Sequence, residues 1–116
     1  MKRLDSHSIG IQQGETVLFS DFQVGGEMWT GTGDRIVRRR VVFNEAFRDA
    51  PNVMTHLSMW DVDKGTNNRM DVRAEDIDET GFDILFQTWG DTRVARVRVG
   101  WMAIGTLKEA DDWELY

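Results

Sequence analysis

A polar loop at residues 61–69, DVDKGTNNR, gathers several side chains that could bind a metal or a ligand. Asp61 and Asp63 stand two residues apart, a spacing found in calcium loops of the EF-hand type. Such a loop also needs an oxygen ligand where Gly65 stands and a bidentate glutamate where Val72 stands, and it has neither. The sequence therefore favours a plain polar loop, whose Asn and Asp side chains hydrogen-bond their own backbone.

Arg69 ends this loop and offers a different chemistry. A guanidinium is a planar fork of donors, and such a fork can bind paired oxygens, for example two neighbouring sugar hydroxyls. The alternative is an ion pair with Asp61 or Asp63, and the pattern alone favours that alternative.

Trp89 lies where an alternating segment ends, in QTWGDTRV at residues 87–94. Gly90 and Asp91 begin a turn directly after it, which places the indole at an edge of the domain. An indole face at such an edge can stack on the C–H face of a sugar or on another aromatic ring. Packing beneath the loop is the alternative, and the pattern weighs the two about equally.

A glycine-rich segment, GGEMWTGTGDR at residues 25–35, predicts tight turns and close approach of the backbone. A phosphate cradle is the sharper idea, but it needs the frame GxxxxGK[ST], which the sequence lacks. We therefore expect a plain loop, with Trp29 capping the core.

Arg38, Arg40, Arg96 and Arg98 alternate with apolar residues and could form a basic stripe for nucleic acid. The formal net charge is -6, and no aromatic residues interleave with these arginines. The sequence instead predicts that they pair with Asp and Glu, within one protomer or across an oligomer. Nucleic acid is not an expected partner.

Catalysis has little support in the sequence. The only histidines are His7, near the start of the chain, and His56, which lies on an expected strand with no evident acid partner. No nucleophile elbow or metalloprotease motif is present. A glycosidase pair among the carboxylates Asp61, Asp63, Asp71 and Asp91 is no more than chance gives in a chain with 20 carboxylates. We expect no enzyme and no bound metal or other cofactor.

The elements that must position these side chains are strands. Five segments alternate strictly between apolar and polar residues, a pattern typical of half-buried strands. They are residues 35–43, 52–60, 70–76, 81–89 and 93–104, and a sixth, less regular strand is expected at 15–22. No segment has helical periodicity over a helical length, although 44–50 could form one turn before Pro51. These features predict an all-β sandwich or barrel.

A chain of 116 residues fits one domain. We divide it into an N-terminal segment, 1–34, with one strand and the glycine-rich loop packed on the domain, a body, 35–105, and an acidic tail, 106–116. There is no cysteine, no secretory signal at the N-terminus and no apolar run long enough to cross a membrane. These features suggest a bacterial or phage-like origin and synthesis in the cytoplasm, with any display outside the cell needing another route.

Several segments together resemble the H-type lectin domain. They are PNV at 51–53, MWDVDKGTNNR at 59–69, the strand MDVRAED, and ETGFDILFQTWGDTRVARVRVGWMAIG at 79–105. The resemblance implies a six-stranded antiparallel β-sandwich that assembles as a homotrimer, with two trimers able to stack as a hexamer. It also implies sugar sites at subunit interfaces that bind galactose or N-acetylgalactosamine without a metal.

The resemblance also implies which residues bind sugar. Arg69 stands in the place of the family's arginine, and Asn67 in that of a matching asparagine. Trp89 corresponds to the tryptophan of a TW motif. The family completes its site with a glycine and an aspartate from the neighbouring protomer, and Gly33 and Asp34 are their expected equivalents.

Two positions depart from the animal members of the family. Gly90 stands where they have a histidine, and Ala95 where they have a tyrosine. Both absent side chains help to orient the sugar, so specificity and affinity are open to change. Trp29 of the neighbour's glycine-rich loop is one candidate replacement.

The sequence thus predicts a module that binds glycans non-covalently at trimer interfaces. Arg69, Asn67 and Trp89, which are retained, favour this function. Gly90 and Ala95 favour the alternative, a structural trimerisation module of a phage-like tail or surface assembly whose sugar site has decayed. A small glycosidase is a more distant third possibility.

Overall fold

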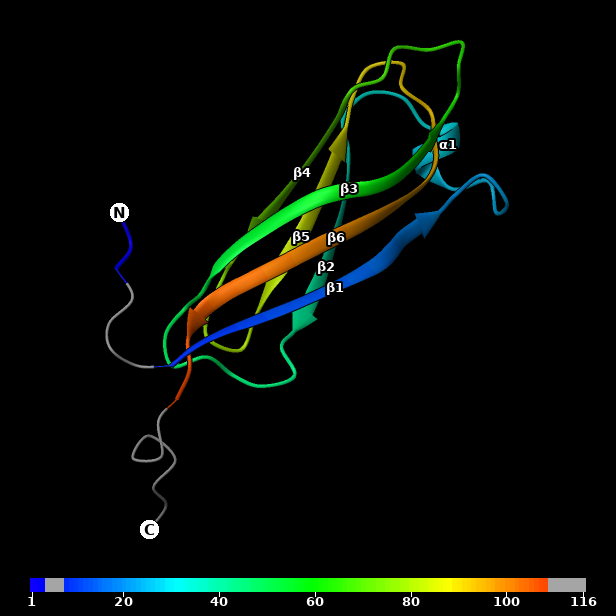
Figure 1. Cartoon of the computed structure of the whole chain (residues 1–116). Helices are drawn as coiled ribbons and strands as arrows, with labels where there is room; N and C mark the ends of the chain where they lie inside the picture. Colours follow the sequence, from blue (N-terminus) through cyan, green and yellow to red (C-terminus); the bar gives the residue numbers. More distant parts are fainter. Residues whose placement is uncertain (4–7, 109–116) are drawn as a thin grey trace.

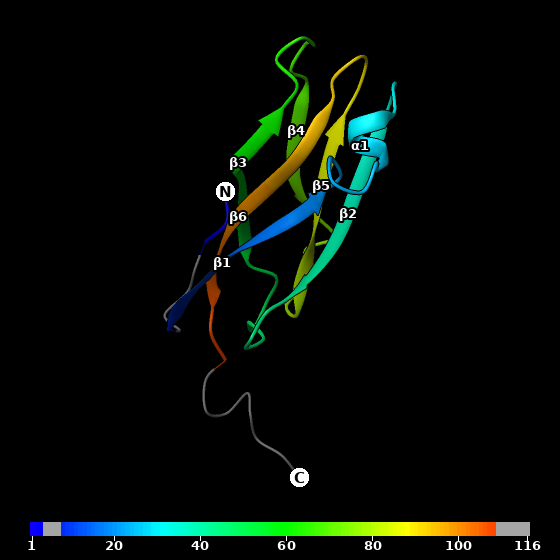
Figure 2. The same cartoon turned by 90° about the vertical axis from the view of Figure 1, so that its right-hand side faces the viewer.

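The computed structural model describes residues 1–3 and 8–108. This part of the chain forms two antiparallel sheets that pack face to face, as Figures 1 and 2 show. One sheet has the order β1–β6–β3, and the other has the order β2–β5–β4. The strands are β1 (Ile9–Ser20), β2 (Arg35–Val42), β3 (Asn52–Val62), β4 (Met70–Glu75), β5 (Gly81–Thr88) and β6 (Val94–Thr106). The predicted six-stranded antiparallel sandwich is confirmed.

The core lies between the two central strands, β5 and β6. Inward residues of both strands are fully buried, as the alternating pattern predicts. They are Phe82, Ile84, Phe86, Val97, Val99 and Ala103. Burying one large apolar side chain contributes about 1.5–3 kcal/mol, so this ladder of side chains is the main force that holds the sheets together.

The first strand differs from its expected range of 15–22, because β1 starts at Ile9 and pairs with β6 along its whole length. Its early inward positions hold no apolar side chains, and one of them is Gly14. A Cβ atom at Gly14 would lie only 3.0 Å from the indole of Trp101. Ile9 and Ile11 face outward instead and are exposed. The apolar residues in the first part of β1 therefore lie on its outer face. This part lacks the inward apolar side chains by which a half-buried strand is predicted.

A single turn of helix, α1 (Glu27–Thr30), lies in the glycine-rich segment where a plain loop was expected. The carboxylate of Asp21 accepts a 2.9 Å hydrogen bond from the amide of Met28, and the Met28 side chain is buried. Trp29 is only half-buried, so Met28 fills the core where Trp29 was expected to cap it. Residues 44–50 form no helical turn.

The outer face of the β2–β5–β4 sheet carries a network of ion pairs. Arg38 lies 2.8 Å from Glu75 and 3.0 Å from Asp83, while Arg40 lies 3.3 Å from the same Asp83 carboxylate. The hydrogen bond from Arg38 is the main cause that lowers the pKa of Asp83. On the other sheet Arg96 pairs with Asp61. The predicted pairing of the arginines with acidic residues is confirmed within one protomer.

The proposed division of the chain into an N-terminal segment, a body and a tail remains a prediction. Thr106, placed in the acidic tail, still pairs with Ile9 as the last residue of β6. Residues 109–116, most of that tail, and His7 lie outside the described residues. Within the described part of the chain, no helix is long and apolar enough to span a membrane.

Candidate functional site

Three loops meet at one end of the sandwich, the upper end in Figure 1. They are residues 31–34 between α1 and β2, 63–69 between β3 and β4, and 89–93 between β5 and β6. The amide of Gly33 donates a 2.9 Å hydrogen bond to the carbonyl of Gly90, which joins the first loop to the third. The loops thus bring together the residues that the sequence singled out at widely separated positions.

Two buried threonines fix the backbone of Arg69. The hydroxyl of Thr88 donates to the Arg69 carbonyl at 2.6 Å, and the Arg69 amide donates to the Thr92 hydroxyl at 3.0 Å. Both threonines are fully buried, whereas the Arg69 side chain is 41% exposed. The guanidinium therefore projects from a rigid base into solvent, where it can meet a ligand.

Thr92 also positions the residue two places before Arg69. Its hydroxyl donates a 2.6 Å hydrogen bond to the carbonyl of Asn67 while it accepts from the Arg69 amide. One hydroxyl thus ties the second loop to the third. Sequence reasoning did not select Thr92. The available signal was a polar residue directly after a turn and before an apolar strand.

Asp91 is the ion-pair partner of Arg69, at 3.1 Å. The side-chain amide of Asn67 donates to the same carboxylate at 3.3 Å. The hydrogen bond from Asn67 is the largest cause that lowers the pKa of Asp91, and the positive charge of Arg69 adds to it. Sequence reasoning named Asp91 only as part of the turn and as one of four unpersuasive carboxylates.

The prediction that Arg69 pairs with Asp61 or Asp63 is wrong, because both carboxylates have other partners. Asp61 pairs with Arg96, and Asp63 lies 3.2 Å from Arg93. Asp63 also accepts a 2.8 Å hydrogen bond from the amide of Gly65, which confirms the prediction that the loop hydrogen-bonds its own backbone. Among residues 1–3 and 8–108 there is no cluster of three side chains suited to hold a metal ion.

The turn after Trp89 brings the backbone close to Arg69. Gly90 has φ +70°, a left-handed conformation that favours glycine. A Cβ atom there would lie 3.4 Å from the Arg69 guanidinium, in van der Waals contact with it, so the turn and the arginine are direct neighbours. Trp89 is 38% exposed, which leaves part of the indole free at the rim.

Arg35 is a buried cation that holds the three-loop corner together. It is 2% exposed, and it donates to the carbonyls of Gly33 at 3.0 Å, Met28 at 3.1 Å and Thr92 at 2.7 Å. It also reaches the Gly90 carbonyl at 3.3 Å. Burying a guanidinium is costly unless its donors are satisfied, and here carbonyl oxygens satisfy them. Sequence reasoning gave Arg35 no role of its own, although it ends the glycine-rich segment 25–35 and begins the alternating segment 35–43.

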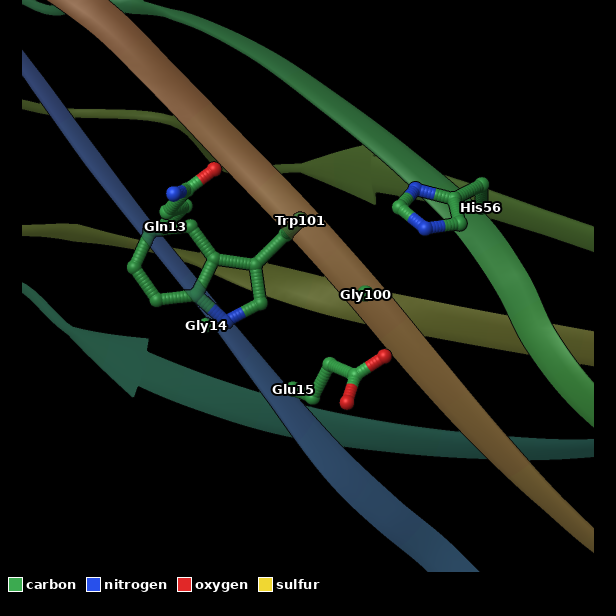
Figure 3. A pocket seen from close by; sticks show the side chains of 6 residues that line it. All are labelled: Gln13, Gly14, Glu15, His56, Gly100 and Trp101. Atoms are coloured by element: carbon green, nitrogen blue, oxygen red, sulfur yellow. The ribbon is translucent and has the colours of Figure 1, made fainter.

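A shallow depression of about 360 Å³ lies away from this corner, on the sheet β1–β6–β3. Figure 3 shows Glu15 and His56 on opposite sides of Gly100 in β6. Both residues are paired in register with Gly100. A Cβ atom at Gly100 would lie 2.6 Å from the imidazole of His56, so the depression exists because this glycine has no side chain. The sequence did not place Glu15 near His56, because the two lie on separate strands.

The sequence model of the H-type lectin domain matches residues 38–104, more than half of the chain. The chain belongs to the H-type lectin domain family. Its fold is therefore a lectin-like carbohydrate-binding fold. The resemblance that the sequence showed to this family is confirmed.

Relatives of this H-type lectin domain include a protein of Fuscovulum blasticum named "ATP synthase subunits region ORF 7". It is 55% identical over 108 residues, which cover 93% of this chain and 94% of that protein. A polypeptide of discoidin-1 from Dictyostelium discoideum is 29% identical over 104 residues, covering 87% of this chain. The structure of recombinant discoidin II from the same organism matches with a TM-score of 0.75 at 26% identity over 91% of this chain. The chain spans 41% of the length of either discoidin.

The structure of this H-type lectin domain places the two positions at which the sequence was expected to depart from the animal members. Ala95 is buried, and its carbonyl accepts from the amides of Asp21 and Phe22, so it lies within the packed strand. Gly90 forms the turn beside Arg69. Gly33, expected from a neighbouring protomer, lies beside Gly90 of its own chain.

Proposed function

We propose that this domain binds galactose- or N-acetylgalactosamine-type glycans non-covalently at the three-loop corner, as a homotrimer with sites at the subunit interfaces. The observation that carries the proposal is the fixed and exposed Arg69. Its backbone is held by Thr88 and Thr92, while its side chain is 41% exposed beside the carboxylate of Asp91 and faces solvent. Membership in the H-type lectin domain family supports the same function.

The corner provides the groups that a neutral sugar needs. Arg69 donates, and the neighbouring carboxylate of Asp91 accepts, so two adjacent hydroxyls could satisfy both. The exposed part of Trp89 offers an apolar surface for the C–H face of the ring. In this proposal Asp34, which is exposed, reaches the site of the adjacent protomer. A single shallow site of this kind binds weakly, and a trimer that displays three sites gains avidity.

The outer face of β1–β6–β3 is the surface that supports self-association. Its exposed apolar side chains include Ile9, Ile11, Val17 and Met54, each at least 50% exposed. The opposite sheet carries a network of ion pairs across its outer face, with exposed apolar side chains only on β2, at Ile36 and Val42, among the described residues of that sheet. Because clustered apolar surface favours burial, we assign this face to contacts between copies of the chain.

The deciding experiment is a glycan array combined with light scattering on the same purified protein. Binding of terminal galactose or N-acetylgalactosamine by a trimer or a hexamer is the expected result, and EDTA should leave that binding unchanged. Met54→Glu should break the assembly, whereas Val42→Glu, a similarly exposed site on β2, should leave it intact. A monomer that binds no glycan would contradict the proposal.

A structural trimerisation module is the second candidate function. It is favoured by Gly90 and Ala95, the two positions at which the resemblance implies that side chains of the animal members are absent. A stable trimer that stays silent on every glycan would select this candidate.

A further inference from the structure

The guanidinium of Arg69 is already occupied by a carboxylate from its own chain. Asp91 lies 3.1 Å from it, and both side chains remain about half exposed, at 41% and 55%. Asn67 donates to the same carboxylate. An incoming ligand therefore meets an acceptor and a donor side by side, with no net charge between them.

The position of Asp91 is set by the backbone of the turn that precedes it. The Gly90 carbonyl accepts hydrogen bonds from the Gly33 amide and from Arg35. Because Arg35 is buried and bound to several carbonyls, this turn is anchored in the corner. Asp91 is thus held beside Arg69 by the loop as well as by the ion pair.

The other two arginines of the corner, Arg93 and Arg35, also have partners within the chain. Arg93 lies 3.2 Å from Asp63 and 4.4 Å above the ring of Trp29, and it also donates to the Trp29 carbonyl. Arg35 donates its hydrogen bonds to backbone carbonyl oxygens. An anionic group entering beside Arg69 therefore meets the Asp91 carboxylate as a like charge at its side, and no other arginine of the corner is available to offset it.

We propose that Asp91 is a specificity-determining residue that restricts the site to neutral glycans with adjacent hydroxyls and rejects acidic ones. The inference rests on the proposed glycan-binding function and names its ligand class. A hydroxyl pair satisfies Arg69 and Asp91 together, because one hydroxyl accepts from the guanidinium while the other donates to the carboxylate. A ligand carboxylate satisfies Arg69 alone and is repelled by Asp91.

The test compares methyl galactoside with methyl galactosiduronate, which differs only in having a carboxylate in place of the hydroxymethyl group at C6, by titration calorimetry. The wild-type protein should bind the galactoside at least about tenfold more tightly, since like charges placed side by side disfavour binding. In Asp91→Asn that preference should fall several-fold, because the side chain keeps its size and loses its charge. Asp63→Asn is the matched control, since it removes the same charge from the partner of Arg93. It should leave the preference unchanged.

The possible outcomes separate this inference from the function on which it rests. Equal preference in the wild-type protein and Asp91→Asn, with Asp91→Ser agreeing, would overturn the role of Asp91. Wild-type binding of acidic glycans above neutral ones would also overturn it, while leaving the domain a lectin. Silence towards both probes and the whole array would overturn the proposed function, and the inference with it.

Discussion

The amide of Arg69 donates a 3.0 Å hydrogen bond to the hydroxyl of Thr92, across 23 residues of sequence. The same hydroxyl donates to the carbonyl of Asn67 at 2.6 Å. Two loops that carry candidate ligand-binding side chains are therefore aligned by one buried oxygen atom. The precision of the site depends on this residue, although its side chain is fully buried and out of reach of a ligand.

Thr92→Val should weaken both the fold and the site. Valine keeps the shape of threonine but leaves the Arg69 amide and the Asn67 carbonyl without a partner. Each buried polar group left unsatisfied costs about 1–3 kcal/mol. We expect a lower free energy of unfolding by chemical denaturation and weaker glycan binding by calorimetry. Thr92→Ser retains the hydroxyl and is the control; an equal loss in that variant would assign the effect to packing.

Arg69→Ala should abolish glycan binding and preserve the assembly. Losing two charge-assisted hydrogen bonds lowers affinity on the order of a hundredfold or more. The side chain is exposed, so the melting temperature should change little. Arg73→Ala on β4 is the control, because Arg73 is a similarly exposed arginine paired with Asp71 and Glu75. Undiminished binding by Arg69→Ala would remove the assigned site.

Gly90→Ala should lower both the stability of the fold and the affinity for glycans. Its positive φ makes any side chain strained, by roughly 1–2 kcal/mol. A Cβ atom would also stand 3.4 Å from the Arg69 guanidinium. We expect a roughly three- to tenfold loss of affinity, about the value of one hydrogen bond. Gly25 has a similar φ of +66° with open space around it, so Gly25→Ala isolates the backbone strain. Equal affinities of the two variants would contradict a local effect of the Gly90 turn on Arg69.

The carboxyl of Asp78 should titrate with a lowered pKa, and Thr80 should be the residue that lowers it. Hydrogen bonds from the Thr80 hydroxyl and amide are the main causes that lower the pKa of Asp78 from 3.8 to about 2. A lowered pKa stabilises the fold above the ordinary value, and this stabilisation is lost as the pH falls through the folded value. In Thr80→Val the pKa of Asp78, followed by carbon-detected NMR during a pH titration, should rise towards 3.8. In Thr80→Ser, which keeps the hydroxyl, the pKa should stay low. An unmoved Thr80→Val titration would assign the shift to another group.

Much of the fold could be predicted from the sequence, because a half-buried strand must alternate apolar and polar residues. The strands from β2 to β6 lie within a few residues of their expected ranges. Only the first part of β1, before residue 15, was missed, since its early inward positions include Gly14 while Ile9 and Ile11 face outward. What fills the space beside Gly14 is Trp101 of another strand, which no local pattern can show.

The sequence by itself determined the sandwich, the family and the candidate residues Arg69, Asn67 and Trp89, because local periodicity and motif spacing are written along the chain. The tertiary structure alone decided the partners. Arg69 pairs with Asp91, 22 residues away, rather than with the nearer Asp61 or Asp63. Hydrogen bonds and ion pairs extend only about 3 Å, so their partners are set by which loops meet in space.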